Sequence, residues 1–411
     1  MNTRAIRPAW VNTLGVALAL ASGAALATSF RLTDLGTLGG SESFGVAMNA
    51  SGQVTGRSTT AGGETHAFLW NGTTMLDLGT LGGMHSTGWD LNVSGQVTGG
   101  ATTADDEFHA FRWDGTTMQD LGTFGGTSSF GAAINASGQV AGYASTADGD
   151  DHAVLWDGTT MLDLGTLGGR WSQGFAINDS GQVTGTALMP GNANVHAFLW
   201  DGTTMRDLGT VGGADSIGYA INGSGQVTGF AKDGSDTDHA FLWDGTTMLD
   251  FGEGEGRAIN ASGQATGYVR VLSAAGLAHA FLWDGTVLHD LGTLGGFESY
   301  GVAINASGQV TGTADSIIDD DIVLNAFLWD GTTLHDLNAL IDPADPLQPF
   351  VALFQGVDIN DRGQILVYGL DSRTGETHTY IVTPFSAPEP GTLALLGFGL
   401  LGLGVVRRRA A

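Results

Sequence analysis

The chain contains no cysteine, only 8 prolines and few basic residues. The lack of cysteine excludes disulfide bonds, zinc–thiolate sites and a thiol nucleophile. The 15 Lys and Arg residues are outnumbered by 42 Asp and Glu residues, which gives a formal net charge of −27. Such an acidic surface repels phosphate groups, so nucleic acid and anionic lipid are poor partners.

A helical period is also missing outside the two ends, whereas glycine is abundant, with 67 residues in 411. Glycine that lacks a three-residue period excludes collagen and indicates many tight turns. Short extended segments between these turns predict an all-β chain.

Residues 1–27 resemble a secretory signal peptide. Arg4 and Arg7 precede an apolar stretch at 14–21, and the small residues Ala25-Leu26-Ala27 follow it. This order predicts cleavage after Ala27. A transmembrane helix is the alternative, but the apolar stretch is too short to cross a bilayer.

Residues 385–411 combine three features, which are Pro388-Glu389-Pro390, an apolar run at 391–406, and the cluster Arg407, Arg408 and Arg409. Sixteen helical residues span about 24 Å, which is marginal for a hydrocarbon core of about 30 Å. The arginines would stay in the cytoplasm and halt export. Hydropathy alone fits both a permanent and a temporary anchor.

This order of Pro-Glu-Pro, apolar helix and arginines resembles the PEP-CTERM sorting signal. The resemblance implies that an exosortase-type enzyme removes the tail and passes the protein outward through a Gram-negative envelope. It implies a location in the cell envelope, on the outer surface or in the extracellular matrix, with membrane contact only through the temporary helix.

Between the ends, one unit recurs with a period near 43 residues. Its tryptophans are spaced 43, 43, 44, 43, 40 and 46 residues apart, and they are Trp70, Trp113, Trp156, Trp200, Trp243, Trp283 and Trp329. Periods of this size are typical of propellers, solenoids and arrays. In the first unit we expect strands at 44–49, 53–58, 65–70 and 73–78.

Two recurring turns support these strands. Asn71-Gly72, and Asp-Gly in other units, predicts a two-residue type I′ turn between the third and fourth strands. The Asn-x-x-Gly-Gln turn joins the first and second strands and occurs eight times, at Asn49, Asn92, Asn135, Asn178, Asn222, Asn260, Asn305 and Asn360.

The fourth strand also occurs eight times, but out of frame. One copy, residues 32–36, opens the mature chain, and none follows His378. An open solenoid gains nothing from this offset, whereas a ring gains closure. We therefore predict an eight-bladed β-propeller over residues 28–384, in which the N-terminal strand closes the last blade.

Counting outward from each hairpin turn pairs a histidine with an aspartate in successive units. The predicted pairs are His66–Asp77, His109–Asp120, His152–Asp163, His196–Asp207, His239–Asp250 and His279–Asp290. In the seventh unit Asn325 takes the histidine's place opposite Asp336, and His378 should meet Asp34 across the closing blade. A pair that recurs in every unit indicates a structural hydrogen bond rather than catalysis.

The repeats resemble the HAF-repeat family of extracellular proteins, which is named for His-Ala-Phe. The motif stands at His66–Phe68, His109–Phe111, His196–Phe198, His239–Phe241 and His279–Phe281, with near copies at His152 and Asn325. The resemblance covers most of residues 31–384 and implies no known activity.

The second-to-third-strand loops and the crossings between blades vary along the chain and should share one face, which we predict to be the binding face. Its candidate residues are Asp105, Asp106, Glu107, Asp148, Asp150, Asp151, Asp319, Asp320, Asp321, Trp89 and Trp171. The acidic loops could hold calcium or form a solvated rim. We expect the two tryptophans just before first strands, where they could stack on sugars or pack in the core.

Two crossings are irregular. The crossing that contains Glu253, Glu255 and Arg257 is short and could open a notch. Residues 342–354 lengthen another crossing, which could cap the mouth of the channel.

No Ser-His-Asp order, phosphate loop or histidine cluster is present, and we expect no catalytic residue, bound metal or other cofactor. The leading hypothesis is an exported, non-enzymatic surface or matrix protein whose variable face binds polysaccharide or an envelope protein. The alternatives are an extracellular carbohydrate-active enzyme and a calcium-stabilised structural component.

Overall fold

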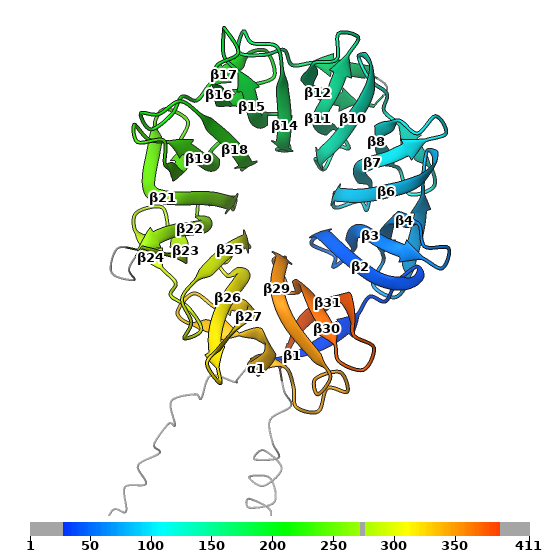
Figure 1. The fold of residues 1–411 in the computed structure, drawn as a ribbon, viewed down its shortest axis with the longest axis vertical. Coiled ribbons are helices and arrows are strands. Elements are labelled where there is room, and N and C mark those ends of the chain that lie inside the picture. The colour runs from blue at the N-terminus through cyan, green and yellow to red at the C-terminus, as the bar shows by residue number, and fades with distance from the viewer. Residues whose placement is uncertain (1–27, 159, 272–275, 387–411) are drawn as a thin grey trace, which may run out of the picture. The chain divides into compact units, whose positions relative to one another are not determined.

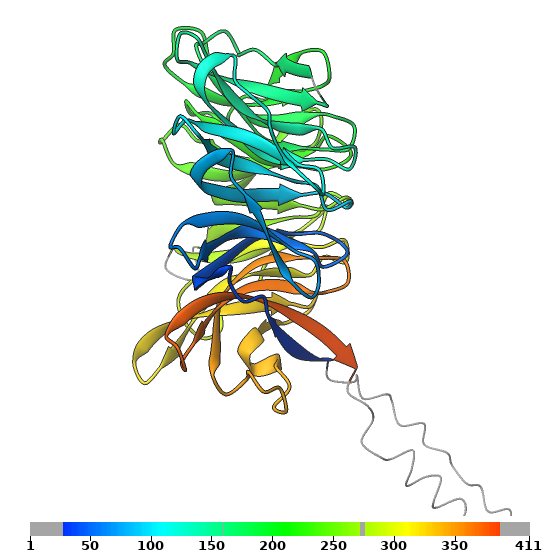
Figure 2. The ribbon, with the colours of Figure 1, turned by 90° about the vertical axis from the view of Figure 1, so that its right-hand side faces the viewer.

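The computed structural model describes residues 28–158, 160–271 and 276–386. Residues Phe30–Pro384 form one compact unit, in which nearly every regular element is a β-strand. Its sheets are arranged in a flat ring around an open centre (Figures 1 and 2). The all-β prediction is confirmed. The predicted signal peptide lies outside the described residues.

Each repeat forms an antiparallel sheet of consecutive strands, and the first strand of each repeat lies nearest the centre (Figure 1). These inner strands are β2 (Gly39–Met48), β6 (Gly82–Leu91), β10 (Gly125–Ile134), β14 (Ser172–Ile177), β18 (Ser216–Ile221), β21 (Met248–Ile259), β25 (Ser299–Ile304) and β29 (Val351–Ile359). The second strands are β3 (Val54–Thr60), β7 (Val97–Thr103), β11 (Val140–Thr146), β15 (Val183–Leu188), β19 (Val227–Lys232), β22 (Ala265–Val271), β26 (Val310–Ile318) and β30 (Ile365–Asp371).

The third strands carry the His-Ala-Phe motif or its variants. They are β4 (Thr65–Trp70), β8 (Phe108–Trp113), β12 (Asp151–Asp157), β16 (Val195–Trp200), β20 (Asp238–Trp243), β23 (Leu277–Trp283), β27 (Asp321–Trp329) and β31 (Glu376–Ser386). The outer strands are β5 (Met75–Gly79), β9 (Met118–Asp120), β13 (Thr160–Asp163), β17 (Met205–Asp207), β24 (Leu288–Asp290), β28 (Leu334–Asp336) and β1 (Thr28–Asp34).

The hydrophobic core lies between neighbouring repeats. One cluster joins Leu155 of the third repeat to Phe198 and Trp200 of the fourth. The motif phenylalanine is fully buried in every repeat that has one, as at Phe198. Burying a side chain of this size contributes about 1.5–3 kcal/mol. The apolar third strand therefore stabilises the contact between two sheets as well as its own sheet.

The turn between the third and fourth strands differs from the prediction. Trp70 pairs with Met75 across this turn. Asn71 Oδ1 accepts a hydrogen bond of 3.0 Å from the backbone N–H of Thr73. Gly72 has a φ of 103°, whereas Asn71 does not have a positive φ. A type I′ turn at Asn71-Gly72 is therefore wrong, because it needs a positive φ at both residues.

A β-bulge recurs between the first and second strands. In β14 and β15 the register shifts between Gly174 and Ala176. Beside this bulge, a Cβ atom added to Gly185 would lie 1.9 Å from the carbonyl oxygen of Gln173. The same clash, at 1.9 or 2.0 Å, would occur at Gly56, Gly99, Gly142, Gly229, Gly267 and Gly312. In these seven repeats the facing strand therefore has no room for a side chain beside the bulge. The eighth repeat has Val367 at this position, and there a second register shift, between Leu353 and Gln355, precedes the bulge.

The short crossing is one uninterrupted strand. β21 pairs with β20 through its first half and with β22 through its second half. The missing residues are those that would have formed a loop between two strands, and here the strand continues through. The notch stays a prediction.

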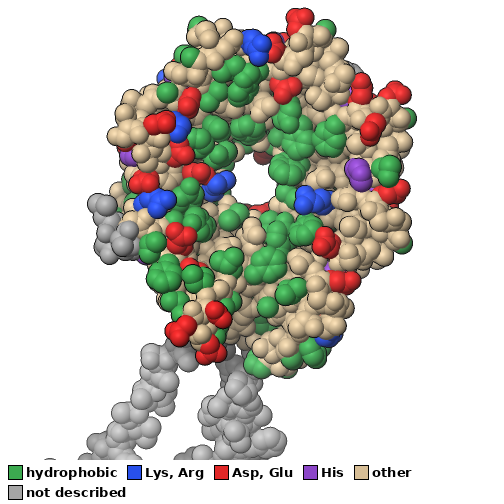
Figure 3. All heavy atoms as spheres, viewed as in Figure 1, with side chains coloured by type: hydrophobic (Ala, Val, Ile, Leu, Met, Phe, Trp, Pro, Cys, Tyr) green, Lys and Arg blue, Asp and Glu red, His purple; other side chains and the backbone are tan. Residues whose placement is uncertain are grey.

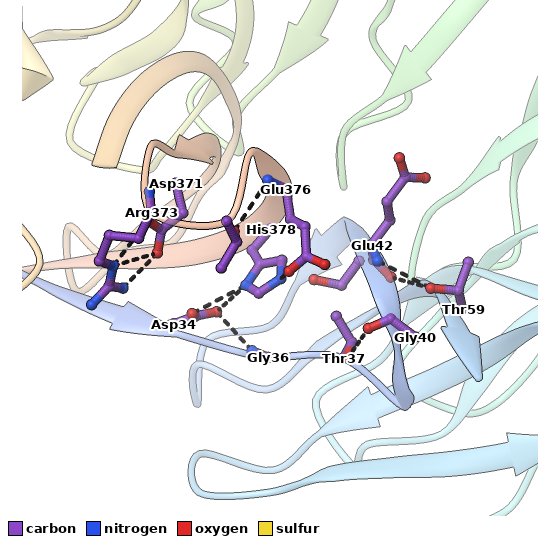
Figure 4. Close-up of polar contacts among 12 residues, drawn as sticks. Asp34, Gly36, Thr37, Gly40, Glu42, Thr59, Asp371, Arg373, Glu376 and His378 are labelled. Carbon is purple, nitrogen blue, oxygen red and sulfur yellow. Dashed lines mark hydrogen bonds and ion pairs between the residues drawn. The ribbon is translucent and has the colours of Figure 1, made fainter. Parts of the chain in front are cut away.

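The N-terminal strand completes the last sheet, whose strand order is β1-β31-β30-β29. The backbone N–H of Leu35 donates to the carbonyl of Thr379 at 3.1 Å. His378 Nδ1 lies 3.1 Å from both carboxylate oxygens of Asp34 (Figure 4). The structure thus brings together the two residues that the offset of the repeats predicted to meet.

The lengthened crossing packs on this closing strand instead of capping the channel mouth, so that prediction is wrong. It begins with the short helix α1 (Leu337–Leu340), and Leu337 is buried beside Phe30 and Leu32. The Asp342 N–H donates to the Phe30 carbonyl at 2.9 Å, and the Leu32 N–H donates to Asp345 Oδ2 at 2.9 Å. Apolar residues at its start hold the crossing against β1.

The turn asparagines link every repeat to the next. Each donates a hydrogen bond of 3.0–3.2 Å from Nδ2 to the backbone carbonyl of the turn asparagine that follows, from Asn49 through to Asn360. Asn360 in turn donates to the carbonyl of Asn49 at 3.2 Å. The eight turns therefore form a closed cycle of hydrogen bonds, which the sequence analysis did not anticipate.

Candidate functional site

The ring has two unlike faces. Because successive strands of a repeat run antiparallel, their connections alternate between the faces. The Asn-x-x-Gly-Gln turns and the Asn71-type turns lie on one, which we call the turn face. The second-to-third-strand loops and the crossings lie on the other, which we call the loop face. Figures 1 and 3 show the molecule from this face. Hydrophobic side chains gather around the channel opening on the loop face (Figure 3).

The turn face contains a cavity of about 330 Å³ at the channel mouth, lined in part by Asn49, Asn92, Asn135 and Asn178. The amides of these asparagines are already used. Asn49 Oδ1 accepts from two backbone N–H groups, while Nδ2 donates to Gln53 and to the Asn92 carbonyl. A cavity whose polar groups are satisfied within the protein offers little to recognise a polar ligand.

The predicted histidine–aspartate pairs are present as side-chain contacts, but their register differs. His66 Nδ1 lies 2.9 Å from both oxygens of Asp77, yet the residue that pairs with Asp77 across the strands is Phe68. The contact is therefore diagonal rather than direct. The corresponding distances are 2.8–3.1 Å for His109–Asp120, His152–Asp163, His196–Asp207, His239–Asp250, His279–Asp290 and His378–Asp34.

The seventh repeat departs from this pattern. Asn325 donates to Ser316 Oγ at 2.9 Å and does not meet Asp336. Asp336 instead caps helix α1 by accepting from the Asn338 N–H at 2.9 Å. The predicted Asn325–Asp336 contact is wrong, because the helix in the lengthened crossing takes the carboxylate.

Hydrogen bonding to aspartate raises the pKa of two of these histidines. The Asp207 side chain raises the pKa of His196 above its usual value, and Asp34 does the same for His378, while burial opposes both shifts. A histidine with a raised pKa adds stability below its unfolded pKa of about 6.5, and this stability is lost as the pH rises through the folded value.

We therefore expect the melting temperature to fall between pH 6 and pH 9, with a part of the fall due to His196. Asp207→Asn keeps the shape of the side chain and removes its charge, so it should lower the melting temperature at pH 6 more than at pH 9. Thermal melts of both proteins across this range test the expectation. An equal effect at both pH values would contradict it.

The acidic loops of the loop face are used in turns and ion pairs. Asp319 and Asp320, with φ values of 53° and 70°, form the tip of the β26–β27 hairpin, and Asp321 is the first residue of β27. Asp106 also has a positive φ, of 64°. Glu107 lies 3.5 Å from His109. Asp148 is an exposed loop residue.

In the third repeat Asp150 lies 3.6 Å from Arg170, and Asp151 accepts from Gln173 at 3.2 Å. In the part of the chain that the structure describes, no three histidine or acidic side chains come together in a way that could hold a metal ion. The acidic side chains of these loops thus take part in turns and in ion pairs with neighbouring residues.

The two candidate tryptophans differ in position. Trp171 directly precedes β14, is partly buried, and accepts the Leu188 N–H through its carbonyl at 2.9 Å. We expected Trp89 to precede its strand, but it lies within β6, at the bulge. It is 42% exposed, whereas Trp156 of the repeat series is 3% exposed. Of the two, Trp89 is the one available to a ligand.

The acidic residues of the short crossing are paired with arginines. Glu253 lies 2.6 Å from Arg270, and Glu255 is in contact with Arg257. Arg257 also lies over the ring of Tyr219, 5.2 Å from its centroid. A carboxylate in such an ion pair has a partner already, which weakens the case for a catalytic acid here.

Two aspartates that the sequence analysis missed tie inner strands together. Asp358 Oδ2 accepts from the Met48 N–H at 2.8 Å, and Asp90 Oδ2 accepts from the Ile134 N–H at 2.9 Å. Other repeats have alanine at this position, as at Ala47. Burial raises the pKa of Asp358 to about 6 and that of Asp90 to about 7, against the backbone hydrogen bonds. Only their departure from the repeat could have signalled them.

We expect the melting temperature of Asp358→Asn, relative to wild type, to be higher at pH 8 than at pH 4. A carboxyl whose folded pKa is raised loses stability as the pH rises from its unfolded pKa of about 3.9 to its folded pKa, and an uncharged asparagine does not. The amide oxygen of asparagine can still accept the Met48 N–H, but its NH2 group cannot accept the Ile359 N–H that Asp358 Oδ1 accepts at 2.8 Å. This lost hydrogen bond costs the same at both pH values, so thermal melts at pH 4 and pH 8 isolate the effect of the charge. A relative melting temperature that is lower at pH 8 would show that the charged form is the stabilising one.

Comparison with known proteins identifies the C-terminus. Residues 386–409 match the PEP-CTERM protein-sorting motif, which confirms the predicted sorting signal. The motif implies an exported protein that an exosortase processes at the membrane. The predicted apolar helix lies outside the described residues, and within those residues no helix is long and apolar enough to cross a membrane. No curated protein matches the chain.

The solved structures that are similar to this chain include two β-propellers. The β-propeller domain of the Trilobed protease from Pyrococcus furiosus is 11% identical with a TM-score of 0.47, over 77% of this chain and 100% of that one. A puromycin-hydrolysing peptidase of Mycobacterium tuberculosis is 13% identical with a TM-score of 0.40, over 83% of this chain and 57% of that one. A six-bladed lectin of Aleuria aurantia is 12% identical with a TM-score of 0.28, over 88% and 97%.

Proposed function

We propose that the protein is an exported, non-enzymatic component of the cell surface or extracellular matrix. In this proposal it is an eight-bladed β-propeller of the HAF-repeat type, and its loop face binds a ligand, for which polysaccharide is the candidate. The sorting motif at residues 386–409 is the observation that carries the proposal.

The contrast between the faces supports the choice of the loop face. The amides of the turn face are used in the closed cycle from Asn49 to Asn360, and this cycle also supports a count of eight blades. The loop face differs from repeat to repeat and exposes aromatic side chains such as Phe108, which follows directly on a second-to-third-strand loop. A binding site needs a place where the repeats differ, and the loop face supplies it.

The described carboxylates favour binding over hydrolysis. Glycoside hydrolysis needs two carboxyl groups about 5–10 Å apart on either side of a bound sugar. Asp90 and Asp358 have the raised pKa that a catalytic acid needs, but both oxygens of each carboxyl accept backbone hydrogen bonds. Glu253 and Glu255 are held by arginines. Incubation with polysaccharides, followed by measurement of new reducing ends, should show no turnover.

The sorting step has a direct test. A full chain in which Pro388, Glu389 and Pro390 are replaced by alanine should keep its C-terminal segment and stay with the membrane fraction. The wild-type chain should lose that segment and reach the cell surface. Pro384→Ala, a proline just outside the matched residues, is the matched control and should behave as wild type. Equal processing of all three proteins, measured by mass spectrometry of fractionated cells, would refute the proposal.

A further inference from the structure

The second repeat departs from the others at three positions that come together in space. Trp89 stands where the first repeat has Val46, Gly100 where it has Arg57, and Phe108 where it has Thr65. A Cβ atom on Gly100 would lie 2.2 Å from the ring of Phe108, so this ring rests directly on the backbone of β7. The glycine makes room for the aromatic ring beside it.

These rings continue into the third repeat. Phe108 stacks on Phe130 with centroids 6.3 Å apart and planes at 14°, and Trp89 meets Phe130 edge-on at 5.5 Å. Phe130 in turn stacks on Tyr143 at 5.7 Å. We call these four side chains the aromatic platform. It runs from the loop end of β8 to the inner strand β6, beside the channel.

The outer members of the platform are open to solvent. Trp89 is 42% exposed and Phe108 is 38% exposed, although both belong to residue types that are usually buried. Their contact with Phe130 fixes their positions, so little conformational entropy remains to be lost on binding. An exposed and pre-ordered aromatic surface typically marks a binding site.

The surroundings of the platform are polar and acidic. Phe108 pairs with Ser128 of the neighbouring repeat, whose hydroxyl lies near Ser145 at 3.3 Å. The phenol of Tyr143 lies close enough to the carboxylate of Asp151 for that charge to add to the effect of burial in raising its pKa. Flat apolar rings beside hydroxyl and carboxyl groups suit a ligand with one apolar face and hydroxyls at its edge.

A pyranose ring has this character, since its C–H face packs on aromatic rings and its hydroxyls take hydrogen bonds. Nucleobases also stack on aromatic rings, but the net charge of −31 over residues 28–387, from 10 basic and 41 acidic side chains, repels their phosphates. The same charge disfavours uronic-acid and sulfated polymers. The rings pack on one another and so do not form an open cage around a cation.

We propose that Trp89 and Phe108 stack on the sugar rings of a neutral polysaccharide, with Ser128 and Tyr143 available to its hydroxyls. This inference rests on the proposed function and assigns it a place, on the loop face between the second and third repeats, and a ligand class.

Affinity measurements on the purified, exported protein test this inference. The probes are a soluble β-glucan, a mannan and polygalacturonate. Trp89→Ala and Phe108→Ala should each weaken binding to the neutral polymer by about tenfold or more without changing the melting temperature. Phe297→Ala is the matched control, because Phe297 is 46% exposed in another repeat, and it should bind as wild type.

Gly100→Ala gives a second test that removes no aromatic ring. Its methyl group would displace Phe108, so binding should weaken while the change in tryptophan fluorescence on adding polymer becomes smaller. Neutral-polymer binding that survives all three variants would overturn the platform and leave the proposed function standing. Preference for polygalacturonate would overturn the assigned ligand class. If no probe binds, the platform is overturned, and binding of the protein to material extracted from its own cell surface then decides the proposed function.

Discussion

Deletion of residues 28–38 from the full chain should abolish cooperative folding rather than fray one end. The deletion removes β1 and with it Phe30, Leu32 and Leu35, which are 3%, 9% and 3% exposed. Burial of three such side chains contributes about 5–9 kcal/mol, at about 1.5–3 kcal/mol each. Whole domains are stable by only about 5–15 kcal/mol. The loss is therefore comparable with the total.

Further interactions depend on the same strand. Without β1, the lengthened crossing loses the Phe30 and Leu32 backbone groups that Asp342 and Asp345 bind, and His378 loses Asp34. The last repeat would then have an open edge on β31, and an unpaired edge invites aggregation. We expect most of the deleted protein in inclusion bodies and no sharp thermal transition in the remainder.

Point variants separate closure from simple shortening. Phe30→Ala should cost about 3–5 kcal/mol, as for other buried phenylalanines. Thr33→Ala, on the exposed side of the same strand, should change stability by less than about 0.5 kcal/mol. Chemical denaturation measures both. A deleted protein with a wild-type transition would mean that the ring is held without β1.

The sequence predicts the parts of this fold that depend on counting. Eight Asn-x-x-Gly-Gln turns and a fourth strand out of frame were enough to place Asp34 beside His378, because a ring has only one way to use the extra strand. This inference rests on composition and order, and these do not require atomic detail.

Features that depend on geometry were not predictable in this way. The histidine–aspartate contacts were inferred from a direct pairing across a two-residue turn. The connection between the strands in fact runs from Asn71 to Thr74, so Asp77 pairs with Phe68 and contacts His66 diagonally. The predicted contact is still made, because a diagonal neighbour lies within reach of a histidine side chain. The cycle of asparagines depends on how close adjacent turns lie, which no single repeat reveals. Trp89 was expected before its strand, because the bulge that exposes it has no clear sequence signal.

We expect Gly185→Ala to be severely destabilising, because Gly185 faces the bulge between Gly174 and Ala176. The new Cβ atom would lie 1.9 Å from the Gln173 carbonyl oxygen and 3.0 Å from the Gly174 Cα atom. Both obstacles belong to the backbone of the inner strand, so a change of side-chain rotamer cannot relieve the clash. Overpacking against mobile side chains costs about 1–3 kcal/mol, and a rigid obstacle should place this variant at or above about 3 kcal/mol.

Gly223→Ala is the matched control, because it adds the same methyl group to the neighbouring repeat where no atom lies within 4 Å. Alanine already stands at the equivalent position of the first and third repeats, at Ala50 and Ala136. The substitution should be neutral or stabilise by up to about 1 kcal/mol, since alanine restricts the unfolded chain. Denaturant titrations compare the two variants. A mild effect of Gly185→Ala would mean that β14 can move away from β15, and the bulge would then be a consequence of the glycine rather than the reason for it.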